Sequence, residues 1–234
     1  MKAILKRELR AYFQTPIGYI FIGMFLVLSG IFFILYTVQS GYPTLDSVLY
    51  NLLTVFIFLV PILTMRSFSE ERNKKTDQLL LTSPASVREI VLGKFFAAAA
   101  VYIITLLLTL LYLIVIARHG EPAYLQTLCS YIGFALLGLT FISIGLFVSS
   151  CTENQIVAAI VTFALLLMFY VIGSLKDSVS SPFLSTILSA LALTEPFSTF
   201  NVGILALAPT VYYISVTALL LFFTEQVVES RRWK

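Results

Sequence analysis

The pair Gly93-Lys94 is the first place to look for chemistry, because nucleotide-binding loops of the form G-x-x-x-x-G-K-[ST] end in this way. Here Phe95 follows the lysine, where a serine or threonine would be needed. Arg88 stands where the first glycine of such a loop should be. The chain therefore does not bind nucleotide by this device.

The sequence also lacks the sets of residues that a metal site or a hydrolase would need. His119 is the only histidine, so a site with several histidine ligands cannot be built within one chain. The sequence has no G-x-S-x-G motif and no paired carboxylates in its apolar stretches. Glu195 is a lone carboxylate that could contact a substrate, although a capping or solvated role is favoured. We assign no catalytic, cofactor-binding or metal-ligating residue.

The composition points to lipid as the solvent. The chain has 234 residues, of which 59% are hydrophobic and 12% charged, whereas soluble domains carry about 25% charged residues. Six stretches without a charged residue are long enough to cross a bilayer. They are approximately 17–38, 48–65, 95–117, 128–150, 156–174 and 204–224. The sequence predicts an all-α membrane protein with six transmembrane helices in a single domain, 1–234.

The basic residues indicate how these helices are oriented. Thirteen of the fifteen lie in 1–14, in 66–94 or in the tail from Arg231, and only Arg118 and Lys176 fall on the other side. Because lysine and arginine favour cytoplasmic loops, we expect both termini inside the cell. The first apolar stretch is too long for a signal peptide and lacks a cleavage site. The predicted location is the cell membrane.

Uncharged spans narrow the possible functions. Ion-coupled transporters and pumps usually place charged residues inside the membrane, and the six stretches contain none. A transporter with its own proton relay is therefore disfavoured. Three classes remain: a subunit powered by another protein, a passive pore, or a membrane scaffold.

The N-terminal segment 1–14 has the pattern of an amphipathic helix that lies flat at a membrane surface. Its lysines and arginines lie mostly opposite an apolar face, and Pro16 suits the start of the next helix, with Thr15 as its N-cap. The alternative is an ordinary basic flank. The residues of the apolar face are Ile4, Leu5, Leu9, Tyr12 and Phe13.

The loop 66–94 is expected to form a helix, a break at 82–84 and a second helix. Opposite charges four residues apart predict the ion pairs Arg66–Glu70, Glu70–Lys74 and Glu71–Lys75, so that replacing both glutamates would cost under about 1 kcal/mol. Ser86 and Glu89 match a capping box, as does 152–155. From charge alone, docking of a partner and a solvated hairpin are equally good interpretations.

Two further features concern packing. The outer segment 175–203 is apolar but too short to span, which favours a re-entrant or interfacial helix that Glu195-Pro196 ends. Small residues on the fourth and fifth helices allow close approach, either within one bundle or between two copies. These are Gly133, Gly138, Gly145, Ser149, Ala158 and Ala159.

Over most of its length the sequence resembles the permease subunits of type-2 ABC exporters, especially the gliding-motility-type branch. The best segments are 65–72 (MRSFSEER), 79–86 (LLLTSPAS) and 89–95 (EIVLGKF). Two further segments are 145–155, with GLFVSS and TENQ, and the tail 229–233 (ESRRW). Each motif is weak alone, but their order is fairly specific.

The resemblance implies roles for the cytoplasmic elements. Segment 1–14 would be the family's connecting helix, and 66–78 would be the coupling helix that sits in a cleft of the ATPase subunit. The residues of this predicted ATPase-coupling interface are Arg66, Phe68, Glu70, Glu71, Arg72, Lys74, Lys75 and Asp77.

The resemblance also implies partners. They are a separate ABC ATPase that binds ATP and magnesium, a second permease copy, identical or related, and the lipid bilayer. An accessory extracytoplasmic protein stays open, and no nucleic acid is expected. This chain would hold no cofactor and form the substrate path of an ATP-driven exporter. The alternative is a non-transporting membrane anchor of a motility or surface-assembly complex.

Overall fold

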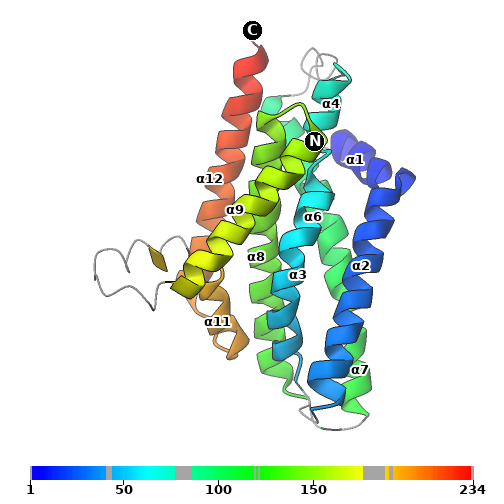
Figure 1. Cartoon of the computed structure of the whole chain (residues 1–234), viewed down its shortest axis with the longest axis vertical. Coiled ribbons are helices and arrows are strands. Elements are labelled where there is room, and N and C mark those ends of the chain that lie inside the picture. Colours follow the sequence, from blue (N-terminus) through cyan, green and yellow to red (C-terminus); the bar gives the residue numbers. More distant parts are fainter. Residues whose placement is uncertain are drawn as a thin grey trace.

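The computed structural model is a bundle of helices (Figure 1). It describes residues 2–40, 44–76, 86–118, 120, 122–175, 188–189 and 192–232. The helices are α1 (Lys2–Gln14), α2 (Pro16–Phe33) with the π-helical turn η1 (Ile34–Val38), α3 (Asp46–Thr64), α4 (Ser69–Asn73), α6 (Val87–Leu108), α7 (Leu111–Ala117), α8 (Tyr124–Cys151), α9 (Gln155–Leu175), α11 (Glu195–Asn201) and α12 (Leu207–Arg232).

Among the described residues, six helical segments are long and apolar enough to cross a membrane, which agrees with the predicted number. They are α2 with η1, α3 continuing to α4, α6 with α7, α8, α9 and α12. Several begin or end beyond the predicted stretches, because backbone hydrogen bonding continues past the apolar part of a helix. As a result, Asp46 starts α3, Lys94 lies inside α6 and Glu225 lies inside α12.

Helix α8 is the centre of the bundle. In its most apolar window 72% of the residues are buried, against 17% in α9 and 11% in α12. Aromatic rings from α2, α3 and α6 pack against rings of α8. The Phe56 ring lies 4.9 Å from Tyr102 and 5.5 Å from Phe134, measured between centroids. The outer faces of α9 and α12 therefore stay available to lipid or to another chain.

The glycines of α8 are used within the chain. A Cβ added at Gly138 would lie 2.3 Å from the Tyr102 ring on α6, and one at Gly145 would lie 2.1 Å from the Thr64 hydroxyl on α3. At Gly133 it would meet Phe200 of α11 at 2.4 Å. Of the two interpretations of these small residues, packing within one bundle holds for all three positions.

The two ends of the bundle differ in composition. We call the end formed by α1, α4, the start of α6 and the α8–α9 turn the charged end (Figure 1). The N-terminus and the C-terminal part of α12 lie there too, whereas α7 and α11 lie at the opposite end. Whether the charged end is cytoplasmic stays a prediction.

The predicted outer segment is only partly within the described residues, which omit 176–187 and 190–191. Helix α11 starts at Glu195, with Pro196 in its first turn, and whether Glu195-Pro196 also ends a preceding helix stays a prediction. Proline is tolerated at this place since a first-turn N–H has no partner within the helix. Phe197 and Phe200 of α11 are fully buried against the bundle.

Candidate functional site

The candidate site lies at the charged end, where α1 meets α4 and α6. Helix α1 lies across the end of the bundle, and the chain turns sharply into α2 (Figure 1). The turn is tight, since a Cβ at Gly18 would lie 2.6 Å from the Tyr12 carbonyl oxygen. Thr15 stands at the predicted N-cap position of α2, but its side chain does not cap the helix, because its hydroxyl donates to the Ala11 carbonyl at 2.9 Å. Such back-bonding to the preceding turn competes with capping.

The apolar face predicted for α1 is partly used inside the chain. Ile4, Leu9 and Tyr12 pack against the core of the bundle, and Gly93 of α6 leaves the room that Ile4 occupies. Leu5 is half-buried, whereas Phe13 is exposed and lies against Tyr19. The position of α1 at a membrane surface stays a prediction.

Helix α4 is shorter than the predicted coupling helix 66–78. It covers only Ser69–Asn73. It ends because Lys75 adopts a left-handed conformation, with φ of 55°, and the Thr76 N–H turns back to the Glu71 carbonyl at 2.8 Å. A left-handed residue stops a helix in this way. Asp77 and the predicted break at 82–84 lie outside the described residues.

Ser149 of α8 holds the start of α4. Its hydroxyl oxygen accepts hydrogen bonds from the backbone N–H groups of Phe68, at 3.1 Å, and Ser69, at 3.2 Å. The same hydroxyl donates to the Met65 carbonyl at 3.1 Å. The first N–H groups of a helix have no partner within it. Ser149 therefore fixes α4 to the central helix.

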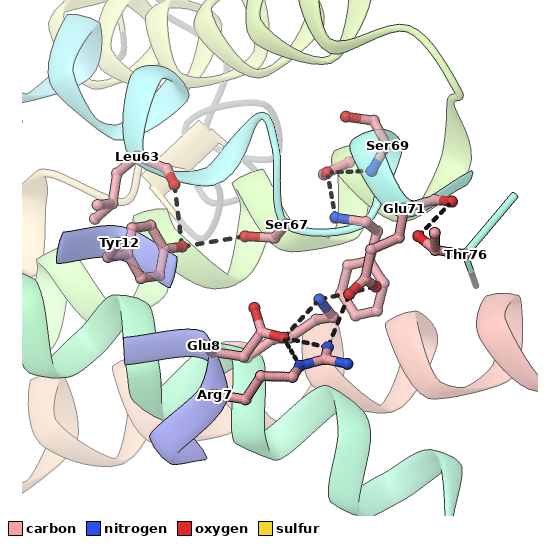
Figure 2. Close-up of polar contacts among 11 residues, drawn as sticks. Arg7, Glu8, Tyr12, Leu63, Ser67, Ser69, Glu71 and Thr76 are labelled. Atoms are coloured by element: carbon pink, nitrogen blue, oxygen red, sulfur yellow. Dashed lines mark hydrogen bonds and ion pairs between the residues drawn. The ribbon is translucent and has the colours of Figure 1, made fainter. Parts of the chain in front are cut away.

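Four charged residues at this end form a closed ring of ion pairs (Figure 2). Arg7 contacts Glu8 and lies 2.8 Å from Glu71. Lys94 lies 3.3 Å from Glu8 and 2.9 Å from Glu71. Each cation thus contacts both carboxylates, and the ring joins α1, α4 and α6. The Lys94 side chain is only 1% exposed.

Two of the three predicted pairs of the loop are confirmed. Glu70 accepts from Arg66 at 2.8 Å and from Lys74 at 2.7 Å. The predicted pair Glu71–Lys75 is wrong, because Glu71 points to the ring instead (Figure 2). The predicted cost of replacing both glutamates assumed that Glu71 belonged to an exposed pair; because Glu71 contacts the buried Lys94 instead, we expect a larger cost.

Tyr12 adds a neutral contact between α1 and the segment leading into α4. Its hydroxyl donates to the Leu63 carbonyl at 3.1 Å and lies 3.2 Å from the Ser67 hydroxyl (Figure 2). Removal of this hydroxyl from water raises the pKa of Tyr12 to about 12. Burial opposes the charge on Arg7, but Glu8 and Glu71 outweigh it and raise the pKa of Arg7 above its usual value.

A cleft of about 440 Å³ opens between α1 and the α3–α4 segment. Its walls carry both charge signs together with a few apolar side chains. The lining residues include Arg7, Glu8, Tyr12, Arg66, Glu70, Glu71, Lys74 and Lys94. In the described part of the chain no group of acidic, histidine or cysteine residues could hold a metal ion.

The two predicted capping boxes fared differently. The Ser86 hydroxyl accepts from the Glu89 N–H at 3.2 Å, which confirms the cap of α6. The cap of α9 is Asn154, whose side-chain oxygen accepts from the Ile156 N–H at 2.9 Å. Thr152 instead accepts from the N–H of Asn154. An Asn side chain reaches the N–H two residues on, so the box predicted for 152–155 is replaced by this cap.

Sequence reasoning missed Lys94, Glu8 and Ser149 as site residues. A signal for Lys94 was present, because the Ser86 cap starts α6 eight residues before it. Lys94 then falls one turn after Ile90 and one turn before Ala98, on the buried face of that helix. A lysine on an apolar helix face requires an anionic partner from elsewhere.

An all-helical bundle with six candidate spans is a multi-pass membrane protein. A family model described as ABC-2 family transporter protein matches residues 49–228, and the chain belongs to this family. It is thus the membrane permease component of an ABC transporter and not itself a catalyst; such permeases generally have an ABC ATPase partner. The match begins within α3, so α1 and α2 lie outside it. No curated protein matches the chain.

Proposed function

We propose that this chain forms the substrate path of an ATP-driven exporter and is driven by a separate ABC ATPase that docks at α4. The observation that carries the proposal is the way α4 is held. Ser149 binds it to α8, and Glu71 binds it to α1 and α6. A displacement of α4 by the ATPase would therefore be transmitted directly to α8, α1 and α6.

The two lysines that directly follow α4 supply the docking surface in this proposal. Lys74 and Lys75 are exposed, whereas Phe68 is buried and Glu71 is bonded inward. The first two would contact the ATPase, and the other two would hold α4 from behind. ATP and magnesium would be bound by the partner, both termini would lie in the cytoplasm, and the gliding-motility-type branch remains the expected one.

A second copy would complete the path. The glycines of α8 are already occupied, so pairing would use the outer helices. Helices α2 and α9 expose many apolar side chains, including Val27, Ile31, Ile156 and Ile160. Single cysteines along α2, α3 and α9 should crosslink between copies with helical periodicity in native membranes. An accessory extracytoplasmic protein would attach at the opposite end.

The docking test compares two charge reversals of equal size at the same end. We expect Lys74→Glu with Lys75→Glu to abolish co-purification of the partner ABC ATPase, while membrane insertion is unchanged. Lys2→Glu with Lys6→Glu on the exposed face of α1 is the matched control and should retain the ATPase. Equal retention by both variants would contradict docking at α4. An ATPase that binds but whose activity the permease does not alter would favour the membrane-anchor alternative.

A further inference from the structure

We propose that Lys94 is the positioning residue that makes α1, α4 and the start of α6 move as one body. The part of this inference that concerns rigidity rests on the structure alone. The part that concerns transmission from the ATPase to α1 rests on the proposed function.

The ring of ion pairs joins three helices. Lys94 and Arg7 each contact both Glu8 and Glu71, so the two carboxylates are bridged twice and the charges balance. Arg7 and Glu8 come from α1, Glu71 from α4 and Lys94 from α6. Displacing any one of these three helices would therefore break two ion pairs.

Burial makes Lys94 the central member. Its side chain is 1% exposed, against 51% for Arg7. The ammonium group lies 5.2 Å from the centre of the Phe68 ring, which covers it on the α4 side. Because a buried cation needs its carboxylates, Lys94 disfavours any arrangement in which Glu8 or Glu71 moves away.

None of the residues of helix α1 is fully buried. Besides the ring, α1 is held by apolar packing, with Ile4 at the Gly93 notch and Leu9 against the core, and by the Tyr12 hydroxyl. The adjacent residues Gly93 and Lys94 thus serve the same helix, one by close packing and one by charge.

The ion pairs outside the ring that involve Arg66, Arg72, Lys74 and Arg88 do not join α1 to α4. Arg66, Glu70 and Lys74 belong to one continuous segment. Arg72–Glu153 joins α4 to the α8–α9 turn, and Arg88–Glu225 joins α6 to α12. Neither of these two pairs reaches α1.

The first experiment measures rigidity in the full chain without a partner. Spin labels are attached to cysteines at Arg10 on α1 and Asn73 on α4, both exposed, after Cys129 and Cys151 are replaced. Pulsed electron resonance in lipid nanodiscs then gives the distribution of the distance between α1 and α4. We expect one narrow distance in the parent chain and loss of that single distance in Lys94→Met.

Two variants decide between a specific and a general effect. Lys94→Arg keeps the charge and should restore the narrow distribution. Arg88→Met is the matched control, because it removes a cation from the same helix whose pair does not involve α1 or α4. A narrow distribution in Lys94→Met, or equal broadening in Arg88→Met, would overturn the proposal. If Lys94→Met does not accumulate, Glu8→Gln takes its place with the same criteria.

The second experiment tests transmission, using the complex with the ATPase and a reference label at Gln226 on α12. In the parent chain ATP should change the distances from Gln226 to both α4 and α1. In Lys94→Met only the distance to α4 should change. An unchanged response of α1 in that variant would overturn transmission through Lys94. If ATP moves nothing in the parent chain, the proposed function fails while the rigidity result stands.

Discussion

The charged end and the interior of the bundle satisfy their polar groups in different ways. In the interior the bonded groups are neutral: the Thr105 hydroxyl donates to the Val101 carbonyl of its own helix at 2.7 Å, and the Tyr102 hydroxyl of α6 donates to the Phe134 carbonyl of α8 at 2.7 Å. At the charged end, Lys94 bonds to residues of two other helices. The interior is therefore held by the fit of helix surfaces together with neutral hydrogen bonds, whereas the charged end is held by ion pairs between helices.

This difference has a mechanical meaning. Contacts that depend on shape weaken gradually as two helices slide, but an ion pair in a water-poor place has a narrow range of good geometry. A transporter that receives force at one end benefits from rigid connections there and from adjustable packing in the membrane. The predictions below test this contrast, beginning with the variant of largest expected effect.

Glu71→Ala should lower the free energy of unfolding by about 3 kcal/mol, because it removes one partner of a buried ion pair. Glu70→Ala is the matched control from the same helix. Neither of its partners is buried as Lys94 is, since the side chains of Arg66 and Lys74 are 29% and 64% accessible, so the expected loss is about 1 kcal/mol. Thermal unfolding in detergent measures both. Equal losses would show that the ring is no stronger than a surface pair.

Gly145→Leu tests the interior and should cost about 2 kcal/mol, because overpacking a filled site forces neighbours apart. The new side chain would collide with Thr64, since even a Cβ would lie 2.1 Å from its hydroxyl. Gly23→Leu on α2 is the control, as a Cβ there meets nothing within 4 Å. In the same unfolding assay, Gly145→Leu should be clearly less stable than Gly23→Leu. The reverse order would contradict the packing of α8 described above.

The contrast also explains what could be predicted from the sequence. The six spans were predictable because apolar length is a local property. The caps of α6 and the pairs of Glu70 were predictable because their partners lie within four residues. The partner of Glu71 on α1 lies 64 residues away, so counting four residues along the loop chose Lys75 instead.

Lys94 was not predicted as a site residue, for a related reason. A hydropathy window treats a charged residue as a boundary, so the third predicted span began at Phe95. The structure places that boundary inside α6, where the aliphatic stem of the lysine packs within the bundle and only its ammonium group needs a partner. The particular acceptors, Glu8 and Glu71, depend on how α1 folds back, which no local pattern specifies.

Tyr12→Phe should lower the free energy of unfolding by about 1 kcal/mol at neutral pH, since it removes one buried hydrogen bond. The effect should depend on pH. The pKa of Tyr12 is raised to about 12 in the folded chain and is about 10 when unfolded. The folded state therefore holds the proton longer, and this contribution is complete below pH 10 and is lost as pH rises toward 12.

The measurement compares unfolding midpoints of the parent chain and Tyr12→Phe at several pH values. Their difference should be constant up to about pH 9 and should shrink above pH 10. The comparison with the phenylalanine variant cancels the titration of lysines, which both chains share. A difference that grows with pH would contradict burial of the Tyr12 hydroxyl.

Glu153→Gln should have the smallest effect and shows how local the rigidity of the charged end is. Its pair with Arg72 has an N–O distance of 2.7 Å, but the Glu153 side chain is 59% exposed. Such a pair contributes about 0.5 kcal/mol or less, and salt screens it, since the Debye length is only about 3 Å at 1 M. The difference in unfolding midpoint between the parent chain and Glu153→Gln should therefore disappear at high salt. The difference between the parent chain and Glu71→Ala should largely persist, because the Lys94 side chain that Glu71 contacts is only 1% exposed. If high salt removed both differences, the ring would behave as a surface pair, and the contrast between a rigid charged end and an adjustable interior would rest on packing alone.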